Sequence, residues 1–246
     1  MKDNFSTHAD KYAKFRPSYP DDLFKYILSL VPARESAWDC GTGNGQVAQQ
    51  LARSFARVSA TDISRQQLDN AAAATNIDYS VQPAEKTSFP DNAFDLITVA
   101  QAIHWFDFDA FYKEVDRTIR NDGILAVIGY GLFQTTPAID QLIAAFYRSV
   151  IGPYWDKERK YVDENYQTIP FPYEEIETPA FRNDFQWTFD HLIGYLETWS
   201  AVKHYEKQKG SNPISLISAD LKKAWGEAPK IAGYFPILLR IARIKK

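Results

Sequence analysis

The sequence of 246 residues has one cysteine, Cys40, and four histidines. A single cysteine excludes an internal disulfide bond and any metal site built from several thiolates. His191 and His204 have no acidic partners at metal-ligand spacing, so no metal site is predicted. No apolar run approaches the length of a membrane-spanning helix, and the first residues lack the apolar core of a signal peptide. We therefore expect a cytoplasmic protein without a membrane partner.

The sequence also lacks a cluster of basic residues of the kind that binds nucleic acid. Lys and Arg number 28 against 31 Asp and Glu, which gives a net charge of −3, and no block of basic residues stands out. The few basic residues between Arg240 and Lys246 are more simply interpreted as a solvated chain end. Binding to phosphates needs a clustered basic surface. We expect no nucleic-acid partner.

Aromatic residues, in contrast, make up 15% of the chain and crowd its second half. Many of them must belong to the core, but aromatic faces also suit flat ligands and cations. Tyr154, Trp155, Arg159 and Tyr161 form an aromatic cluster with one arginine, which suits a small organic anion. Trp199 is a further candidate for this site. Each of these residues, taken alone, is better explained as a structural residue.

Segments with the period of a strand alternate with segments of helical period in the first half of the chain. Strands are predicted at 36–40, 57–61, 77–81, 94–100 and 124–130, and helices at 21–30, 45–55, 64–74 and 107–119. This alternation predicts a parallel, doubly wound sheet that binds ligands at the carboxyl ends of its strands. After residue 130 the sequence predicts helices at 136–150, 190–202 and 213–225, short elements at best over 152–189, and a last strand at 235–244.

A glycine-rich loop follows the first of these strands. Asp39 lies near the end of the strand, and glycine then occupies every second position at Gly41, Gly43 and Gly45. Glycine lets a ligand approach the backbone closely. Asp62, seventeen residues after Gly45, ends the next strand and is placed to accept hydrogen bonds from both hydroxyls of a ribose. A nucleoside-bearing cofactor is therefore predicted.

Two features of the loop bear on the identity of that cofactor. Gln46 stands where the dinucleotide-binding pattern G-x-G-x-x-G has its third glycine. Asp39 would repel a pyrophosphate but suits a cation such as the ammonium of an amino acid. S-adenosylmethionine is therefore favoured over NAD, and a nicotinamide-dependent oxidoreductase stays as an alternative.

With these motifs the chain resembles the class I S-adenosylmethionine-dependent methyltransferases, in particular the small-molecule group of trans-aconitate methyltransferase-like enzymes. The resemblance is carried by AKFRPSYP at 13–20, the loop at 39–45, Asp62, Ala84-Glu85, AQAIHWF at 100–106, GILAV at 123–127 and WSAV at 199–202. It implies an α/β, Rossmann-like sheet, mostly parallel with a final antiparallel strand, plus a helical and aromatic cap. One domain, 1–246, would comprise an N-terminal lid at 1–20, a cofactor-binding core at 21–130, helices and the substrate cap at 131–234, and a final strand at 235–246.

The resemblance also implies roles for individual residues. The residues implied in cofactor binding are Tyr12, Arg16, Asp39, Gly41, Thr42, Gly43, Gly45, Asp62, Ile63, Ala84, Glu85 and Gln101. Pro83 stands where the family usually has a carboxylate near the adenine, so that contact departs from the pattern. The candidate substrate-binding residues are Tyr19 and, from the aromatic cluster described above, Trp155, Arg159 and Trp199.

His104 and Trp105 follow the fourth strand and are the candidates for the chemical step. Histidine at this place can remove a proton from an acceptor hydroxyl or amine, or it can only make local hydrogen bonds. Trp105 can equally be a packing residue. Methyl transfer from an activated donor depends on positioning, and a carboxylate acceptor needs no base.

The function predicted from the sequence is S-adenosylmethionine-dependent methyl transfer to a small organic acceptor, with a carboxylic acid as one candidate. The protein would be a monomer or a homodimer. A binding module that holds S-adenosylmethionine without turnover is an alternative from another class. The sequence leaves open whether oxygen, nitrogen or carbon receives the methyl group.

Overall fold

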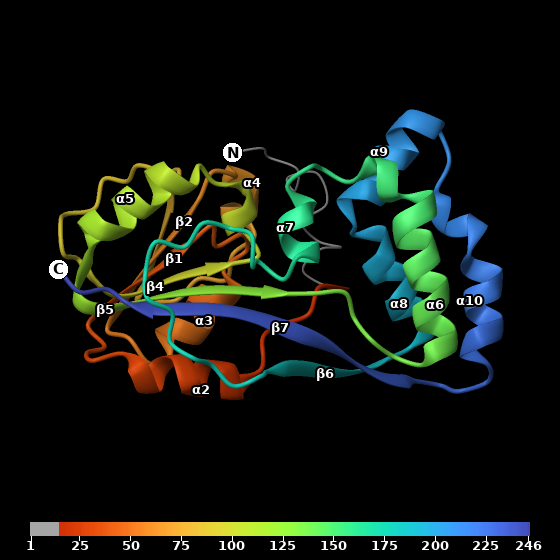
Figure 1. The fold of residues 1–246 in the computed structure, drawn as a ribbon, viewed down its shortest axis with the longest axis horizontal. Helices are drawn as coiled ribbons and strands as arrows, with labels where there is room; N and C mark the ends of the chain where they lie inside the picture. The colour runs from red at the N-terminus through yellow and green to blue at the C-terminus, as the bar shows by residue number, and fades with distance from the viewer. Residues whose placement is uncertain (1–14) are drawn as a thin grey trace.

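A seven-stranded sheet runs through the whole molecule in the computed structural model, which describes residues 15–246 (Figure 1). The strand order is β3-β2-β1-β4-β5-β7-β6. The strands are β1 (Ser36–Cys40), β2 (Arg57–Asp62), β3 (Ile77–Val81), β4 (Phe94–Ala100), β5 (Ile119–Tyr130), β6 (Arg182–Trp187) and β7 (Ile231–Arg243). The pairs among β1 to β5 are parallel, and β7 is antiparallel to both β5 and β6. The predicted fold class, mostly parallel with an antiparallel final strand, is confirmed.

Helices cover both faces of the parallel part of the sheet. Alternate strand residues face opposite sides, so Ala37 and Leu96 pack toward α2 (Asp21–Leu30) and α3 (Gln46–Ala52), whereas Trp38 and Ile97 belong to the cluster that includes α5 (Phe108–Thr118). Every residue of β1 is buried, as expected for a strand of a parallel sheet that helices cover on both faces. The carboxyl ends of β1, β2 and β4 meet at one edge, where the chain enters its loops.

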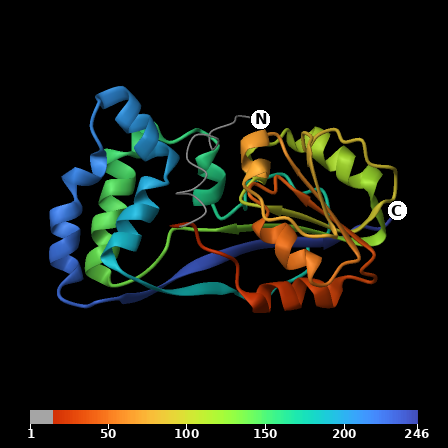
Figure 2. The same cartoon turned by 180° about the vertical axis from the view of Figure 1, so that it is seen from behind.

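A helical lobe lies beyond the end of β5 and contains most of the predicted cap range 131–234. Its helices are α6 (Pro137–Ala145), α8 (Phe189–Glu197), α9 (Ser200–Lys209) and α10 (Ser218–Trp225), and α7 (Arg159–Asp163) lies between this lobe and the α/β part (Figures 1 and 2). The lobe has its own aromatic core, in which the rings of Phe133, Trp187, Tyr195 and Phe235 contact one another. None of the helices in the described residues is long and apolar enough to cross a membrane.

Some element bounds differ from the predictions because of contacts between distant segments. The predicted helix 64–74 is only α4 (Arg65–Asp69), since the carbonyl of Ala72 accepts hydrogen bonds from the Gln49 side chain (2.5 Å) and the Tyr79 hydroxyl (3.1 Å). The predicted helix 190–202 is two helices, α8 and α9, divided at Thr198–Trp199, and a 3₁₀ turn over Pro213–Leu216 precedes α10. β6 lies inside the stretch expected to hold short elements at best, and it forms by pairing with β7, which starts four residues earlier than predicted.

Candidate active site

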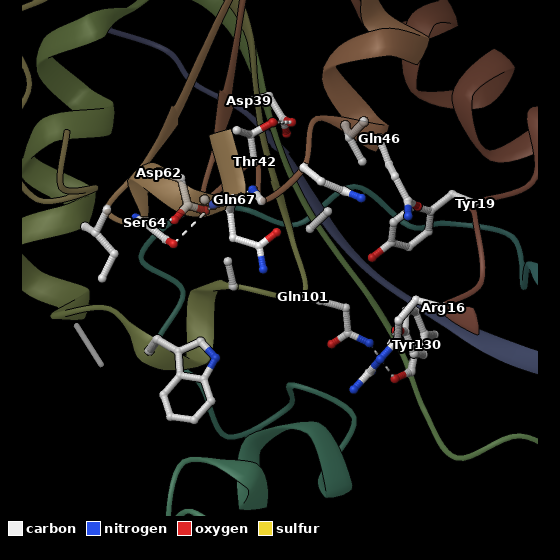
Figure 3. Close-up of a pocket in the computed structure, with 18 of the residues that line it drawn as sticks. Arg16, Tyr19, Asp39, Thr42, Gln46, Asp62, Ser64, Gln67, Gln101 and Tyr130 are labelled. Atoms are coloured by element: carbon white, nitrogen blue, oxygen red, sulfur yellow. Dashed lines mark hydrogen bonds between the residues drawn. The ribbon is translucent and has the colours of Figure 1, made fainter. Parts of the chain in front are cut away.

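A cavity opens at the carboxyl ends of β1, β2 and β4, where the sheet edge was expected to bind a ligand (Figure 3). It contains about 930 Å³ of space between protein atoms, part of it open to solvent. Predicted residues in its wall are Arg16, Tyr19, Asp39, Gly41, Thr42, Gly43, Asp62, Ile63, Gln101 and Trp105. In Figure 3, Asp62 and Gln67 lie on one side of the cavity, and Gln101 and Arg16 lie on the other.

The three glycines of the loop are required for different structural reasons. All three have positive φ, but a Cβ on Gly41 would lie 2.6 Å from the Cβ of Ala102, and one on Gly45 would collide with the Tyr79 hydroxyl. At Gly43 no described atom lies within 4 Å of such a Cβ. Gly41 and Gly45 therefore allow close packing inside the protein, and Gly43 leaves open space at the cavity wall.

The Asp62 carboxylate is held in place by backbone amides. The amide of Gly43 donates to Asp62 Oδ2 (2.9 Å), and the amide of Ser64 donates to Asp62 Oδ1 (2.9 Å). These two bonds join the end of β2 to the glycine loop, so the acidic side chain at the end of β2 has a fixed position in the cavity wall. A fixed carboxylate is pre-organised to accept hydrogen bonds from a polar ligand.

Asp39 is a buried carboxylate with two hydroxyl partners. Thr42 Oγ1 donates to Asp39 Oδ2 (2.5 Å), and Thr98 Oγ1 donates to Asp39 Oδ1 (2.8 Å). Burial raises the pKa of Asp39 to about 6, although the two hydroxyls act in the opposite direction, and the nearby Asp62 adds to the rise. Because no cation is bonded to Asp39 among the described residues, a cationic ligand group would relieve the cost of this buried charge.

A second, smaller cavity adjoins the first and contains about 470 Å³ of space, part of it open to solvent. Both cavities are lined by Arg16, Gln101 and Trp105, and the smaller one continues to His104, Trp155, Asp156, Arg159 and Ser200. The smaller cavity thus collects the predicted catalytic residues His104 and Trp105 and two of the predicted substrate-binding residues. The arrangement provides two neighbouring binding sites with a shared wall.

Arg159 supplies a positive charge to the smaller cavity. Its guanidinium lies over the Trp155 ring, 4.7 Å from the centroid, and its Nε donates to the Tyr147 hydroxyl (2.6 Å). Burial acts to lower the pKa of Arg159, but Tyr147 and Asp163 outweigh it and the pKa is raised. The side chain is therefore charged and held in a fixed direction, as a site for an anion requires.

His104 is buried and electrically neutral at physiological pH. Its Nδ1 lies 3.3 Å from the Tyr166 hydroxyl. Burial lowers the pKa of His104 to about 3, and the positive charge of Arg159 adds to the effect. A histidine in this state is a weak base and a good hydrogen-bonding group.

Several predicted residues do not line either cavity. Gly45 caps α3, and Ala84 is buried in the core beneath the sheet edge. Glu85 accepts a hydrogen bond from the amide of Asp107 (3.1 Å), and Trp199 packs in the core of the helical lobe against Tyr147 and Trp155. Tyr12 lies outside the described residues.

The structure also brings in residues for which no role in binding was predicted from the sequence. Those in the wall of the larger cavity include Gln46, Ser64, Gln67 and Tyr130, and Ser200 and Asp156 line the smaller one. Gln67 follows Asp62 by five residues, and α4 turns it toward the cavity, as Figure 3 shows. The only sequence signal for Gln67 as a cavity residue is its side-chain amide in the first turns of the helix after the second strand.

Comparison with known proteins agrees with the geometry of this site. Residues 38–127, which hold the glycine loop, Asp62 and the turn after β4, match the family model described as a methyltransferase domain. A Dictyostelium discoideum protein described as a methyltransferase is 32% identical over 249 residues, which cover 98% of this chain and 95% of the relative. A Saccharomyces cerevisiae protein described as a probable S-adenosylmethionine-dependent methyltransferase is 30% identical over 124 residues, 47% of this chain and 43% of the relative.

A solved structure extends the similarity to the whole fold. A type II methyltransferase from Anaeromyxobacter dehalogenans is 38% identical and superposes with a TM-score of 0.87 over 94% of this chain and 99% of that chain. The chain belongs to the class I S-adenosylmethionine-dependent methyltransferases. It is a methyltransferase enzyme whose cofactor is S-adenosylmethionine, and the alternatives of a nicotinamide-dependent oxidoreductase and a module without turnover are set aside.

Proposed function

We propose that this methyltransferase transfers the methyl group to a small organic acid, with the cofactor in the larger cavity and the acid in the smaller one. The observation that carries the proposal is the shared wall of Arg16, Gln101 and Trp105 between the two cavities. Methyl transfer requires donor and acceptor to meet in line at close range, and two adjoining sites provide that proximity. The resemblance to trans-aconitate methyltransferase-like enzymes also suggests an acid.

The residues around the larger cavity fit S-adenosylmethionine. Asp62, held by two backbone amides, would accept hydrogen bonds from the ribose hydroxyls, and Asp39 would face the ammonium group. The open space at Gly43 would admit the cofactor close to the backbone. S-adenosylmethionine supplies a methyl group on a positively charged sulfur, which is already activated for displacement.

The charges that line the smaller cavity, two arginines against the one carboxylate of Asp156, favour an acidic acceptor. Arg159 presents a fixed cation there, and Arg16 reaches the same space from the N-terminal side. A carboxylate is already a nucleophile at neutral pH, which agrees with a His104 that is too weak a base to remove a proton. The helical lobe, within the range 131–234, would serve as the cap that excludes water from the acceptor.

The test is a panel of small carboxylic acids, phenols and amines incubated with the enzyme and S-adenosylmethionine carrying a labelled methyl group. Label should pass to one or more acids, and the product should be a methyl ester that mild alkali cleaves. Transfer only to amines or to phenols without an acid group would refute the proposed acceptor class.

Arg159→Met provides the sharper version of this test. Loss of a charged hydrogen-bonding partner should raise KM for the acid by about 10- to 100-fold and leave the affinity for S-adenosylmethionine unchanged. Arg148→Met, which removes an exposed arginine from the same lobe, is the matched control and should behave like the parent enzyme. An unchanged KM in Arg159→Met would show that the acid lies elsewhere.

A further inference from the structure

Tyr166 links Gln101, in the wall that the two cavities share, to His104 in the smaller cavity, although it lies in an irregular segment far along the chain. Its hydroxyl lies 3.2 Å from Gln101 Oε1 and 3.3 Å from His104 Nδ1. Gln101 Nε2 in turn donates to the carbonyl of Tyr130 (3.0 Å). Four groups thus form one continuous line from the end of β5 to the imidazole.

The direction of each hydrogen bond in this line follows from its first member. A backbone carbonyl only accepts, so the amide nitrogen of Gln101 must face Tyr130 and the amide oxygen must face Tyr166. The Tyr166 proton is then donated to Gln101 Oε1, and the Tyr166 oxygen accepts from His104. For that, His104 must carry its proton on Nδ1, which leaves the lone pair on Nε2.

The protein holds Tyr166 in this place against a conformational cost. Tyr166 has φ of 62° and its neighbour Asn165 has φ of 55°, in the left-handed region that side chains disfavour by about 1–2 kcal/mol. Arg240 Nη1 donates to the carbonyls of Tyr166 (3.0 Å) and Ile169 (2.7 Å) and fixes the turn. The fully buried ring packs so closely on Gly129 that a Cβ there would lie 2.6 Å from it.

We propose that Tyr166 is a positioning residue for methyl transfer, which holds His104 in the Nδ1–H tautomer so that Nε2 offers a lone pair to the acceptor cavity. No hydrogen-bond partner of Nε2 is found within residues 15–246, and His104 lines that cavity. The proposal rests on the acceptor site described above. An acid bound by Arg159 then gains a second contact if it carries a hydroxyl or N–H group that donates to His104 Nε2, so the acceptor class narrows to hydroxy or amino acids of small size.

The tautomer can be measured without any substrate. In enzyme labelled with ¹⁵N in its histidines, the ring nitrogens of His104 are assigned by comparison with His104→Gln, and the protonated nitrogen is read near neutral pH. We expect the proton on Nδ1 in the parent enzyme and a shift toward Nε2 in Tyr166→Phe, because the ring still packs but the acceptor oxygen is gone. Tyr173→Phe is the matched control, since the hydroxyl of this half-buried side chain bonds to Asp116 (2.9 Å), outside the site, and its loss should leave His104 unchanged.

Kinetics provide the second readout. Tyr166→Phe should raise KM for a hydroxy acid by about five- to tenfold, with cofactor affinity unchanged, and should have less effect on the matching acid without the hydroxyl. A parent enzyme with the proton on Nε2, or a tautomer that Tyr166→Phe does not change, would overturn the proposal whatever the acceptor is. If Tyr166→Phe fails to fold, the position of the His104 proton in the parent enzyme is by itself the test of the proposal. A correct tautomer with no acid methylated would instead contradict only the acceptor class.

Discussion

Asp39→Asn should make the enzyme without cofactor more stable while it weakens cofactor binding. Asp39 is a carboxylate with only 1% of its surface exposed, and no cation is bonded to it among the described residues. In the proposed contact, the ammonium group of the cofactor neutralises Asp39, so the enzyme without cofactor bears the cost of the buried charge. Asparagine has the same shape and no charge.

The magnitude follows from the pKa, which rises from 3.8 to about 6 because of burial. One pKa unit corresponds to about 1.4 kcal/mol, so a shift of about two units makes the charged form about 3 kcal/mol less favourable in the folded state. The direction in which stability changes with pH follows from the number of protons bound by the folded and unfolded chains. Between about pH 4 and pH 6 the unfolded chain has released the proton that the folded chain still holds, so this carboxyl group makes stability fall as pH rises through that range.

Urea unfolding of both proteins at a series of pH values measures the effect. The stability of Asp39→Asn relative to the parent should increase by about 3 kcal/mol between about pH 4 and pH 7 and then level off. Calorimetry at pH 7 should show cofactor affinity lower by about 10- to 100-fold in Asp39→Asn, as for the loss of a charged partner. A stability difference that does not change with pH would refute the pKa, and an unchanged affinity would refute the contact with the ammonium.

Three further changes test other parts of the site. Asp62→Asn should weaken cofactor binding by about tenfold or more, measured by calorimetry, and unchanged affinity would show that the ribose lies elsewhere. Gly43→Ala should lower stability by about 1 kcal/mol because of its positive φ, and it should also reduce cofactor affinity. Gly45→Ala should lower stability further, because the added Cβ collides with Tyr79. Equal effects of the two substitutions on cofactor binding would contradict the placement of Gly43, rather than Gly45, at the cavity wall. With saturating cofactor and a carboxylate acceptor, the rate should show no titration of His104 near neutral pH, and an inflection near pH 6.5 that His104→Asn abolishes would refute its low pKa.

The parts of the site that the sequence predicted depend on local patterns. Glycine spacing, strand period and the acidic residue near the end of each of the first two strands are visible within a few residues, and parallel strands place their ends at one edge. Gly43 and Asp62 could therefore be predicted to meet before any coordinates were known, and the bond between them is 2.9 Å long. His104 was a candidate for the chemical step and Arg159 for substrate binding, but no local pattern predicted that both side chains line one cavity.

The remaining parts depend on pairings between segments that have no common pattern. Tyr166 is 62 residues from His104 and lies in a stretch without regular structure, so no period predicts their contact. Thr98 is an ordinary polar residue within a buried strand, and its role as partner of Asp39 appears only when β1 and β4 are paired. Such residues stabilise or orient the site without belonging to its motifs.

Arg16 provides a way to test whether the two cavities work as one site. Its guanidinium donates to the Tyr130 hydroxyl (3.0 Å) at the end of β5 and to the Thr198 carbonyl (3.3 Å) in the helical lobe, and Figure 3 shows it beside Tyr130 and Gln101. Because this side chain lines both cavities, Arg16→Met should weaken the binding of cofactor and acceptor together, whereas Arg159→Met weakens the acceptor alone. Tyr130→Phe removes one hydrogen-bond partner of Arg16 but leaves the arginine charge in place. It should therefore reduce both affinities by less than Arg16→Met does. If Arg16→Met changed only one of the two affinities, Arg16 would not contribute to both binding sites in the working enzyme. The helical lobe would then bind the acceptor through Arg159 and would have no contact with the cofactor through Arg16.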